Sequence, residues 1–244
     1  MSYIDPNAEE SFFVRQKEIL SRLGIKESPN VFDVGGNIGQ SIDAYRKLFP
    51  GAAITTFEPL PDCFSTLRQN YGSLSGVSLE NLALSKKKGT MPFYSTKCRA
   101  ASSLLPPDEV VQKKSPKGNY DYDQITVNVD TLDDYFLSKK SGIIDILKID
   151  VQGAELDVLI GAKKLLAENK IRFMYVEVIF ADNYKGQCDV FALAAFLAQY
   201  KYILWDIRPF LFTKSGRLWT ANAMFASDQT REVLENCKDE FPVI

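Results

Sequence analysis

The sequence predicts an α/β fold, in which a doubly wound and mostly parallel sheet carries helices on both faces. Short apolar runs alternate with amphipathic stretches along most of the 244 residues. A glycine-rich turn follows the first apolar run and opens a helix. Near the end of the chain, two strands have only a short turn between them and should pair as an antiparallel hairpin.

The first third of the chain should contain three helices and three strands. Apolar residues recur at helical spacing over residues 9–23, 40–49 and 62–71, and Gly24 and Pro50-Gly51 end the first two of these helices. Short runs that are mainly apolar predict buried strands over residues 31–34, 53–57 and 77–84.

The middle of the chain is polar, and the alternation resumes after it. A hairpin is expected at 89–95 and a strand at 125–129, with an irregular stretch over 106–124. The later elements are strands at 143–149, 171–179, 202–207 and 218–226 and helices at 154–166 and 189–200. We expect a single domain over 1–244, with a helical cap (1–27), a core (28–226) and an acceptor loop or lid (99–124).

Composition excludes several classes of function. A net charge of -2 gives no electrostatic footprint for nucleic acid and no basic patch for a membrane surface. The chain has no histidine, which excludes a histidine base, a Ser-His-Asp triad and HExxH zinc sites. Acid–base chemistry must then come from Asp, Glu, Lys, Tyr or Cys, or from a metal-bound water.

Cysteine spacing and hydropathy indicate a cytoplasmic protein. The four cysteines are scattered without a CxxC pair, which favours reduced thiols: Cys63, Cys98, Cys188 and Cys237. The N-terminus lacks the basic and apolar regions of a signal peptide. No uncharged apolar run approaches the length of a membrane span.

The turn after the first strand indicates a cofactor site. The segment from Asp33 to Gly39 departs from the dinucleotide pattern G-x-G-x-x-G, because Asn37 stands where a second glycine is needed. An acid at Asp33 would repel a pyrophosphate but attract an ammonium or a sulfonium. The helix end would hold a carboxylate. These features favour S-adenosylmethionine, with Asp33, Gly35, Asn37 and Gly39 as cofactor residues.

Two further strand ends extend this site. Glu58 follows Gly39 by 19 residues and ends the second strand, which suits an acid that bridges ribose hydroxyls. Asn81 and Leu82, at the end of the third strand, should border the adenine. A lone acid at a strand end is more often merely solvated, but the glycine-rich turn beside it favours the functional interpretation.

The fourth strand ends in charged residues that predict an acceptor side. Lys148 and Asp150 are two apart and share one face, and Glu177 lies near the end of the neighbouring strand. Asp150 or Glu177 is the candidate base, with Lys148 as an electrostatic partner. A structural Lys148–Asp150 ion pair is the alternative. Carboxylates could instead hold Mg²⁺, which is not favoured because no DxD-type spacing sits at a strand end.

The chain resembles the FkbM family of S-adenosylmethionine-dependent methyltransferases. The resemblance runs from about Val31 to Phe225 and is carried by these runs: Asp33–Gly39, Phe57–Pro59, Asn81–Leu84, Ser102–Leu104, Val129–Asp133, Leu147–Glu155 and Val176–Val178. It implies a seven-stranded class I methyltransferase fold and O-methylation of a hydroxyl, often on a sugar, glycan or polyketide. Lys148, Asp150 and Glu155 carry over as the acceptor-side cluster. We expect acceptor specificity from the N-terminal helix and from residues 99–124.

Three alternatives accompany this interpretation. Tyr135 and Lys139 match the Y-x-x-x-K of short-chain NAD-dependent oxidoreductases, but we interpret them as a surface helix end. A second alternative is a methyltransferase-like module that binds a glycan or a partner without turnover. Four aromatic residues near the C-terminus could pack a hairpin core, stack on a sugar or form a homodimer surface: Trp205, Phe210, Phe212 and Trp219.

Overall fold

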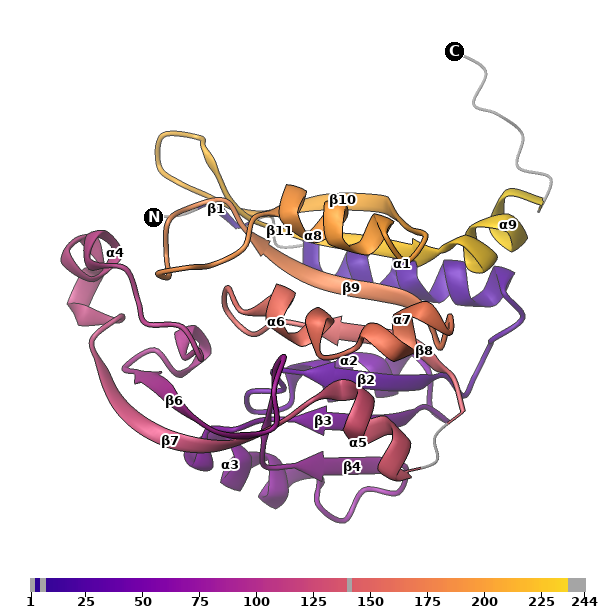
Figure 1. The fold of residues 1–244 in the computed structure, drawn as a ribbon, viewed down its shortest axis with the longest axis horizontal. Coiled ribbons are helices and arrows are strands. Elements are labelled where there is room, and N and C mark those ends of the chain that lie inside the picture. Colours follow the sequence, from indigo (N-terminus) through magenta and orange to yellow (C-terminus); the bar gives the residue numbers. More distant parts are fainter. Residues whose placement is uncertain (1–2, 5–7, 140–141, 237–244) are drawn as a thin grey trace.

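A computed structural model describes residues 3–4, 8–139 and 142–236 (Figure 1). Its main sheet has eight strands in the order β1-β10-β11-β9-β8-β2-β3-β4. The strands are β1 (Tyr3–Ile4), β2 (Asn30–Val34), β3 (Ala53–Phe57), β4 (Val77–Glu80), β8 (Ile144–Ile149), β9 (Ile171–Ile179), β10 (Tyr202–Phe212) and β11 (Leu218–Ser227). Seven of them form the expected mostly parallel sheet, and the two-residue β1 extends its edge.

The sheet has its topological switch point between β2 and β8. Strands β3 and β4 follow β2 on one side of this point, and β9 follows β8 on the other side. All five strands are parallel to one another. Strand β11 inserts antiparallel between β9 and β10, which confirms the C-terminal hairpin. Ligands of doubly wound sheets bind at the carboxyl ends of the strands beside such a point.

Helices cover both faces of the sheet (Figure 1). The apolar residues of α1 (Ala8–Arg22), α2 (Gln40–Leu48), α3 (Pro61–Tyr71) and α9 (Asp228–Asn236) pack on one face. The other face packs against α5 (Leu132–Lys139), α6 (Glu155–Ile160), α7 (Lys163–Ala167) and α8 (Val190–Ala198). The apolar spacing in the sequence did not reveal α9.

A second sheet corrects two of the expected elements. The apolar run 77–84 divides into β4 and β5 (Ala83–Leu84), because the Asn81 side chain donates to the carbonyls of Glu58 and Pro59 where the chain leaves the main sheet. Residues 89–95 belong to one strand, β6 (Gly89–Thr96), which pairs with β7 (Tyr122–Asp130) instead of forming its own hairpin. The order of this sheet is β5-β7-β6.

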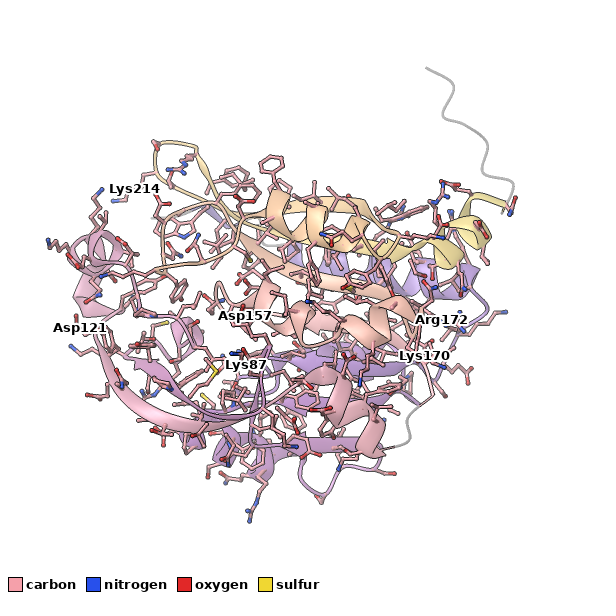
Figure 2. All side chains as sticks on the ribbon, viewed as in Figure 1. Lys87, Asp121, Asp157, Lys170, Arg172 and Lys214 are labelled. Atoms are coloured by element: carbon pink, nitrogen blue, oxygen red, sulfur yellow. The ribbon has the colours of Figure 1, made fainter. Side chains whose placement is uncertain are left out.

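The small sheet is joined to the main body beside α6. Lys86 Nζ lies 2.9 Å from Asp157 Oδ2, and Figure 2 labels Asp157 near the centre of the view. Lys170 and Arg172, at the amino end of β9, lie toward the right of the same view.

The predicted helix over 154–166 is two helices. It breaks at Gly161, where an added Cβ would lie 2.2 Å from the Ser85 carbonyl oxygen. The Asp133 carboxylate then accepts the amides of Lys164 and Leu165 and starts α7. Residues 106–124, expected to be irregular, contain α4 (Glu109–Lys114) and the short 3-10 turn η2 (Pro116–Gly118). A second 3-10 turn, η1 (Arg99–Ala101), precedes this stretch.

Two observations bear on the expected environment of the protein. Cys63, Cys98 and Cys188 are free thiols, and Cys237 lies outside the described residues. In the described ranges, no helix is both long and apolar enough to span a membrane.

Candidate active site

Two adjoining clefts open at the carboxyl edge of the main sheet. The first has a volume of about 630 Å³ and is lined by the turn after β2, by Glu58 and Leu82, and by the end of β8. The second, of about 1230 Å³, is lined by residues of the 98–120 segment and by Glu177 and Trp219. Gln152 lines both clefts, so their boundary lies at the loop after β8.

The glycines of the first turn are required by the packing of the protein against itself. Gly35 has a φ of +86°, and a Cβ there would lie 1.8 Å from the carbonyl oxygen of Asp150. Gly39 has a φ of +107°, and its Cβ would lie 2.2 Å from the Tyr71 ring. Asn37 adopts the left-handed conformation that Asn tolerates. Gly35 and Asn37 line the first cleft, whereas Gly39 does not.

Glu58 closes the turn and faces the first cleft. Its carboxylate accepts the Asn37 amide at 2.9 Å and the Leu60 amide at 2.8 Å. Burial raises the pKa of Glu58 to about 7, against the lowering effect of these two hydrogen bonds. A carboxylate has about four acceptor positions. Glu58 therefore retains capacity for ligand hydroxyls.

The two residues predicted beside the adenine separate in the structure. Leu82 lines the first cleft together with Phe93 and Leu104, which gives that end an apolar wall. Asn81 is exposed and bonds to the backbone at the end of β3. Its contribution to the cleft is therefore to hold the chain that carries Glu58.

Asp33 and Lys148 form a buried ion pair, which corrects the roles expected for both. Lys148 Nζ lies 3.0 Å from Asp33 Oδ1 but 3.9 Å from Asp150 Oδ2. The Asp33 side chain is 0% exposed, and neither residue lines either cleft. Asp33 is therefore neutralised by Lys148 instead of standing free for a ligand cation. Burial alone would lower the pKa of Lys148, but the neighbouring carboxylates outweigh it and raise this pKa.

Asp150 and Glu177 meet through the amide of Gln152. Gln152 Nε2 donates to Asp150 Oδ1 at 2.8 Å and to Glu177 Oε2 at 2.5 Å. Asp150 lines the first cleft and its side chain is 37% exposed, whereas Glu177 lines the second. Burial and the nearby Asp150 charge raise the pKa of Glu177 well above its ordinary value. The structure thus brings the two predicted base candidates together.

Glu155, expected in the acceptor-side cluster, instead organises the loop after β8. Its Oε1 accepts the amides of Val151 and Gly153 at 3.2 and 3.0 Å, and the residue lines neither cleft. Ser103 joins the 99–124 segment to the same loop by donating to the Gln152 carbonyl at 2.8 Å. The loop that carries Gln152 is therefore held from two sides.

Of the two segments expected to give acceptor specificity, one lines the second cleft and the other does not. Residues between Ala100 and Tyr120, within the expected acceptor loop, line it together with Trp219. The N-terminal helix α1 packs against the sheet and α2, and its described side chains line neither cleft. Of the four C-terminal aromatic residues, Trp219 alone appears in this lining.

Two residues that line the clefts were not among the cofactor and base residues predicted from the sequence, namely Gln152 and Arg99. The φ of Gln152 is +57°, and Tyr184 Oη lies 3.1 Å from its Oε1. Its position two residues after Asp150, next to Gly153, was the available signal. Arg99, the first residue of the expected acceptor loop, lines the first cleft instead and donates to Ser95 and Asp62.

Two other expectations can be compared with the geometry. Tyr135 is buried, its hydroxyl donates to Glu80 at 2.7 Å, and Lys139 lies over its ring, so this pair belongs to α5 and to neither cleft. In the described part of the chain, no group of three or more Asp, Glu or Cys side chains is placed to hold a metal ion.

Comparison with known proteins identifies the family. Residues 33–204 match the model of the methyltransferase FkbM domain. The 2-O-methyltransferase NoeI of Sinorhizobium fredii (strain NBRC 101917 / NGR234) is 30% identical over 192 residues, which are 77% of this chain and 78% of NoeI. The methyltransferase sdnD of Sordaria araneosa is 33% identical over 159 residues, 56% of this chain and 61% of sdnD.

A solved structure supports the fold. The rRNA methylase of Streptococcus thermophilus superposes with a TM-score of 0.51 at 9% identity, over 92% of this chain and 99% of that one. At this identity the likeness bears on the fold alone. From the match of the family model, this chain belongs to the FkbM methyltransferase family.

Proposed function

We propose that this FkbM methyltransferase is an S-adenosylmethionine-dependent O-methyltransferase whose acceptor is a hydroxyl of a sugar, a glycan or a related natural product. The observation that carries the proposal is the junction of the two clefts at Asp150, Gln152 and Glu177. The name of NoeI, a 2-O-methyltransferase, supports transfer to oxygen.

The lining of the first cleft fits the cofactor in its chemistry. Glu58 offers acceptor positions for ribose hydroxyls, and the apolar wall at Leu82 suits a nucleobase. The turn at Gly35–Asn37 would hold the amino acid part. Asp33 and Lys148 act behind this turn as positioning residues, because their ion pair joins β2 to β8.

The carboxylate pair at the junction supplies the base. S-adenosylmethionine, when bound, supplies an electrophilic methyl group on a sulfonium. Methyl transfer to an acceptor hydroxyl releases the hydroxyl proton, and the carboxylate pair would take it up. Gln152 holds both carboxylates in place by its two donated hydrogen bonds. A carboxylate whose pKa is raised, as in Glu177, is a stronger base for this step.

We further propose a cytoplasmic location, which the free thiols of Cys63 and Cys188 support. The acceptor in this proposal is a small molecule or a glycan, with no nucleic-acid partner. Homodimer formation stays a prediction from the sequence.

Calorimetric titration with S-adenosylhomocysteine, with NAD⁺ in parallel, tests the cofactor class. We expect binding in the micromolar range for the first and no heat of binding for the second. Binding of NAD⁺ alone would overturn the proposal. Transfer of labelled methyl from S-adenosylmethionine to sugar hydroxyls then separates an enzyme from a binding module, which would hold S-adenosylhomocysteine without turnover.

A further inference from the structure

The second cleft contains buried polar side chains whose oxygen atoms lack hydrogen-bond partners. Thr220 is 5% exposed, and its Oγ1 has no partner among the residues that the structure describes. Asn183 is 3% exposed, and its Oδ1 is likewise unpartnered within the described ranges, although its Nδ2 donates to Tyr120. Both residues line the cleft. An unpaired buried polar group costs about 1–3 kcal/mol, so these two oxygens point to a ligand that supplies donors.

Thr220 shares the face of the sheet that carries Glu177. Asn222 of β11 pairs directly with Glu177 of β9, and Thr220 lies two residues further along β11. Thr220 and Glu177 are therefore diagonal neighbours on one face of two antiparallel strands, and such neighbours lie roughly 7–8 Å apart. This separation is close to the span of one pyranose ring with its hydroxyl groups. One sugar ring can therefore reach the carboxylate and the Thr220 hydroxyl together.

Two aromatic side chains contribute to the lining of the same cleft. Trp219 and Tyr120 both line it, and the Tyr120 ring lies 6.1 Å from that of Tyr184. Aromatic rings offer a flat apolar surface against which a ligand ring can pack. A sugar ring presents matching groups, because its C–H faces are apolar and its rim carries hydroxyls. A planar phenol would fill the aromatic walls but would leave the buried oxygens of Thr220 and Asn183 unpaired.

We infer that the second cleft is the acceptor subsite and that it binds a single sugar ring, with the reacting hydroxyl at Glu177 and a second hydroxyl donating to Thr220. The ring packs against Trp219, and Asn183 accepts from a further hydroxyl. Small side-chain rotations bring the two shielded oxygens onto the ligand, as is common on binding. This inference rests on the proposed function, since it assigns the acceptor of the same reaction.

Steady-state kinetics of the full chain with a panel of acceptors tests the inference. The panel contains methyl glycosides of neutral hexoses and 6-deoxyhexoses, with catechol and phenol as planar alternatives. The wild-type protein should methylate at least one glycoside. The variant Thr220→Val should raise the acceptor KM roughly three- to tenfold through the lost hydrogen bond. Its kcat and its affinity for S-adenosylhomocysteine should stay unchanged, and its Tm should be equal or higher because a buried unpaired hydroxyl is removed.

Matched variants separate recognition from structure. Thr230→Val removes a buried hydroxyl that is already paired with Ser227 at 2.8 Å, so it should lower the Tm without changing the acceptor KM. Trp219→Phe should raise the acceptor KM, whereas Trp205→Phe, outside both clefts, should not. The two conservative tryptophan variants keep an aromatic ring, which favours folding.

Each outcome bears on one of the two proposals. Unchanged acceptor KM values in Thr220→Val and Trp219→Phe would overturn the subsite and leave the methyltransferase function standing. Turnover of phenols without glycosides would overturn the sugar ring as the occupant. Binding of S-adenosylhomocysteine with no transfer to any glycoside would do the same. Failure to bind S-adenosylhomocysteine would overturn the proposed function itself.

Discussion

The two clefts differ in how the chain assembles them. The first is built mainly from turns that directly follow strands β2, β3 and β8, so its key residues stand in short recognisable runs. The second combines the 98–120 segment with Glu177, Asn183 and the end of the C-terminal hairpin, which are far apart in sequence. A cofactor shared by many reactions can be bound by residues at the strand ends alone. The variable acceptor site is formed by loops carried on that scaffold.

The sharpest test of this division is removal of the carboxylates at the junction. Glu177→Gln and Asp150→Asn should each lower kcat by about 10²- to 10⁴-fold, because a positioned base contributes about that much. Affinity for S-adenosylhomocysteine should change little, since the base acts on the acceptor. Single-turnover transfer and calorimetry measure the two effects. Full activity in both variants would remove the carboxylate pair from the mechanism.

The next effect concerns the first cleft alone. Glu58→Gln should weaken S-adenosylhomocysteine binding by about 10- to 100-fold, because hydrogen bonds to a charged group contribute roughly 1.5–3 kcal/mol. Glu80→Gln is the matched control, since Glu80 ends the next strand, accepts from Tyr135 and does not line the cleft. Equal affinities in the two variants would contradict the role of Glu58.

The raised pKa of Glu58 predicts a pH dependence for the first cleft. Because burial raises this pKa from 4.5 to about 7, the ionised acceptor of ribose hydroxyls forms as the pH rises through about 7. The affinity for S-adenosylhomocysteine should increase over that interval and then level off. Calorimetry from pH 6 to pH 8 should show the rise in the wild-type protein, and Glu58→Gln should flatten it. An equal rise in the variant would assign the titration to another group.

The same raised pKa values affect stability with the opposite sign. Glu58 and Glu155 both have pKa values of about 7 in the folded protein, against an ordinary value of 4.5. The folded state therefore binds more protons than the unfolded state between these values, and stability decreases as the pH rises from 4.5 to 7. These two groups should therefore lower the Tm of the ligand-free protein between pH 5 and pH 7, which thermal melts at the two pH values measure. Glu58→Gln should lose less stability over this interval than the wild type.

The smallest expected effect lies outside both clefts. Tyr135→Phe removes the hydrogen bond to Glu80 and should lower stability by about 1 kcal/mol, with kcat and KM unchanged. Chemical denaturation and steady-state assays measure these quantities. Loss of turnover in this variant would revive the oxidoreductase interpretation of Tyr135 and Lys139.

The sequence predicted the fold well because strand–helix alternation is a local signal. Strands at 53–57 and 171–179 agree with β3 and β9 in both bounds. The errors arose where contacts distant in sequence decide. Gly161, where the 154–166 helix breaks, lies close to the Ser85 carbonyl, and Asn81 bonds to the backbone at the end of β3 where the chain passes from β4 to β5. No periodicity within either segment reports such a contact.

The sequence indicated which residues belong to the site, but it did not indicate which of their side chains contact one another. Lys148 was assigned to Asp150 from their spacing along one strand, yet its nearer partner is Asp33 on the neighbouring strand. Register between parallel strands, which places Asp33 opposite Lys148, is absent from the spacing of either. Gln152 was overlooked because an amide carries no charge to attract notice. Its bridging position is visible only in three dimensions.

A crystal structure of the protein with S-adenosylhomocysteine tests the central claim most directly. The account predicts the adenosyl group in the first cleft, ribose hydroxyls on the Glu58 carboxylate, and the sulfur facing the side where Asp150 and Gln152 separate the clefts. The second cleft should stay open for an acceptor. Adenosyl density in the second cleft, or a ribose without contact to Glu58, would contradict the division of the site into cofactor and acceptor halves.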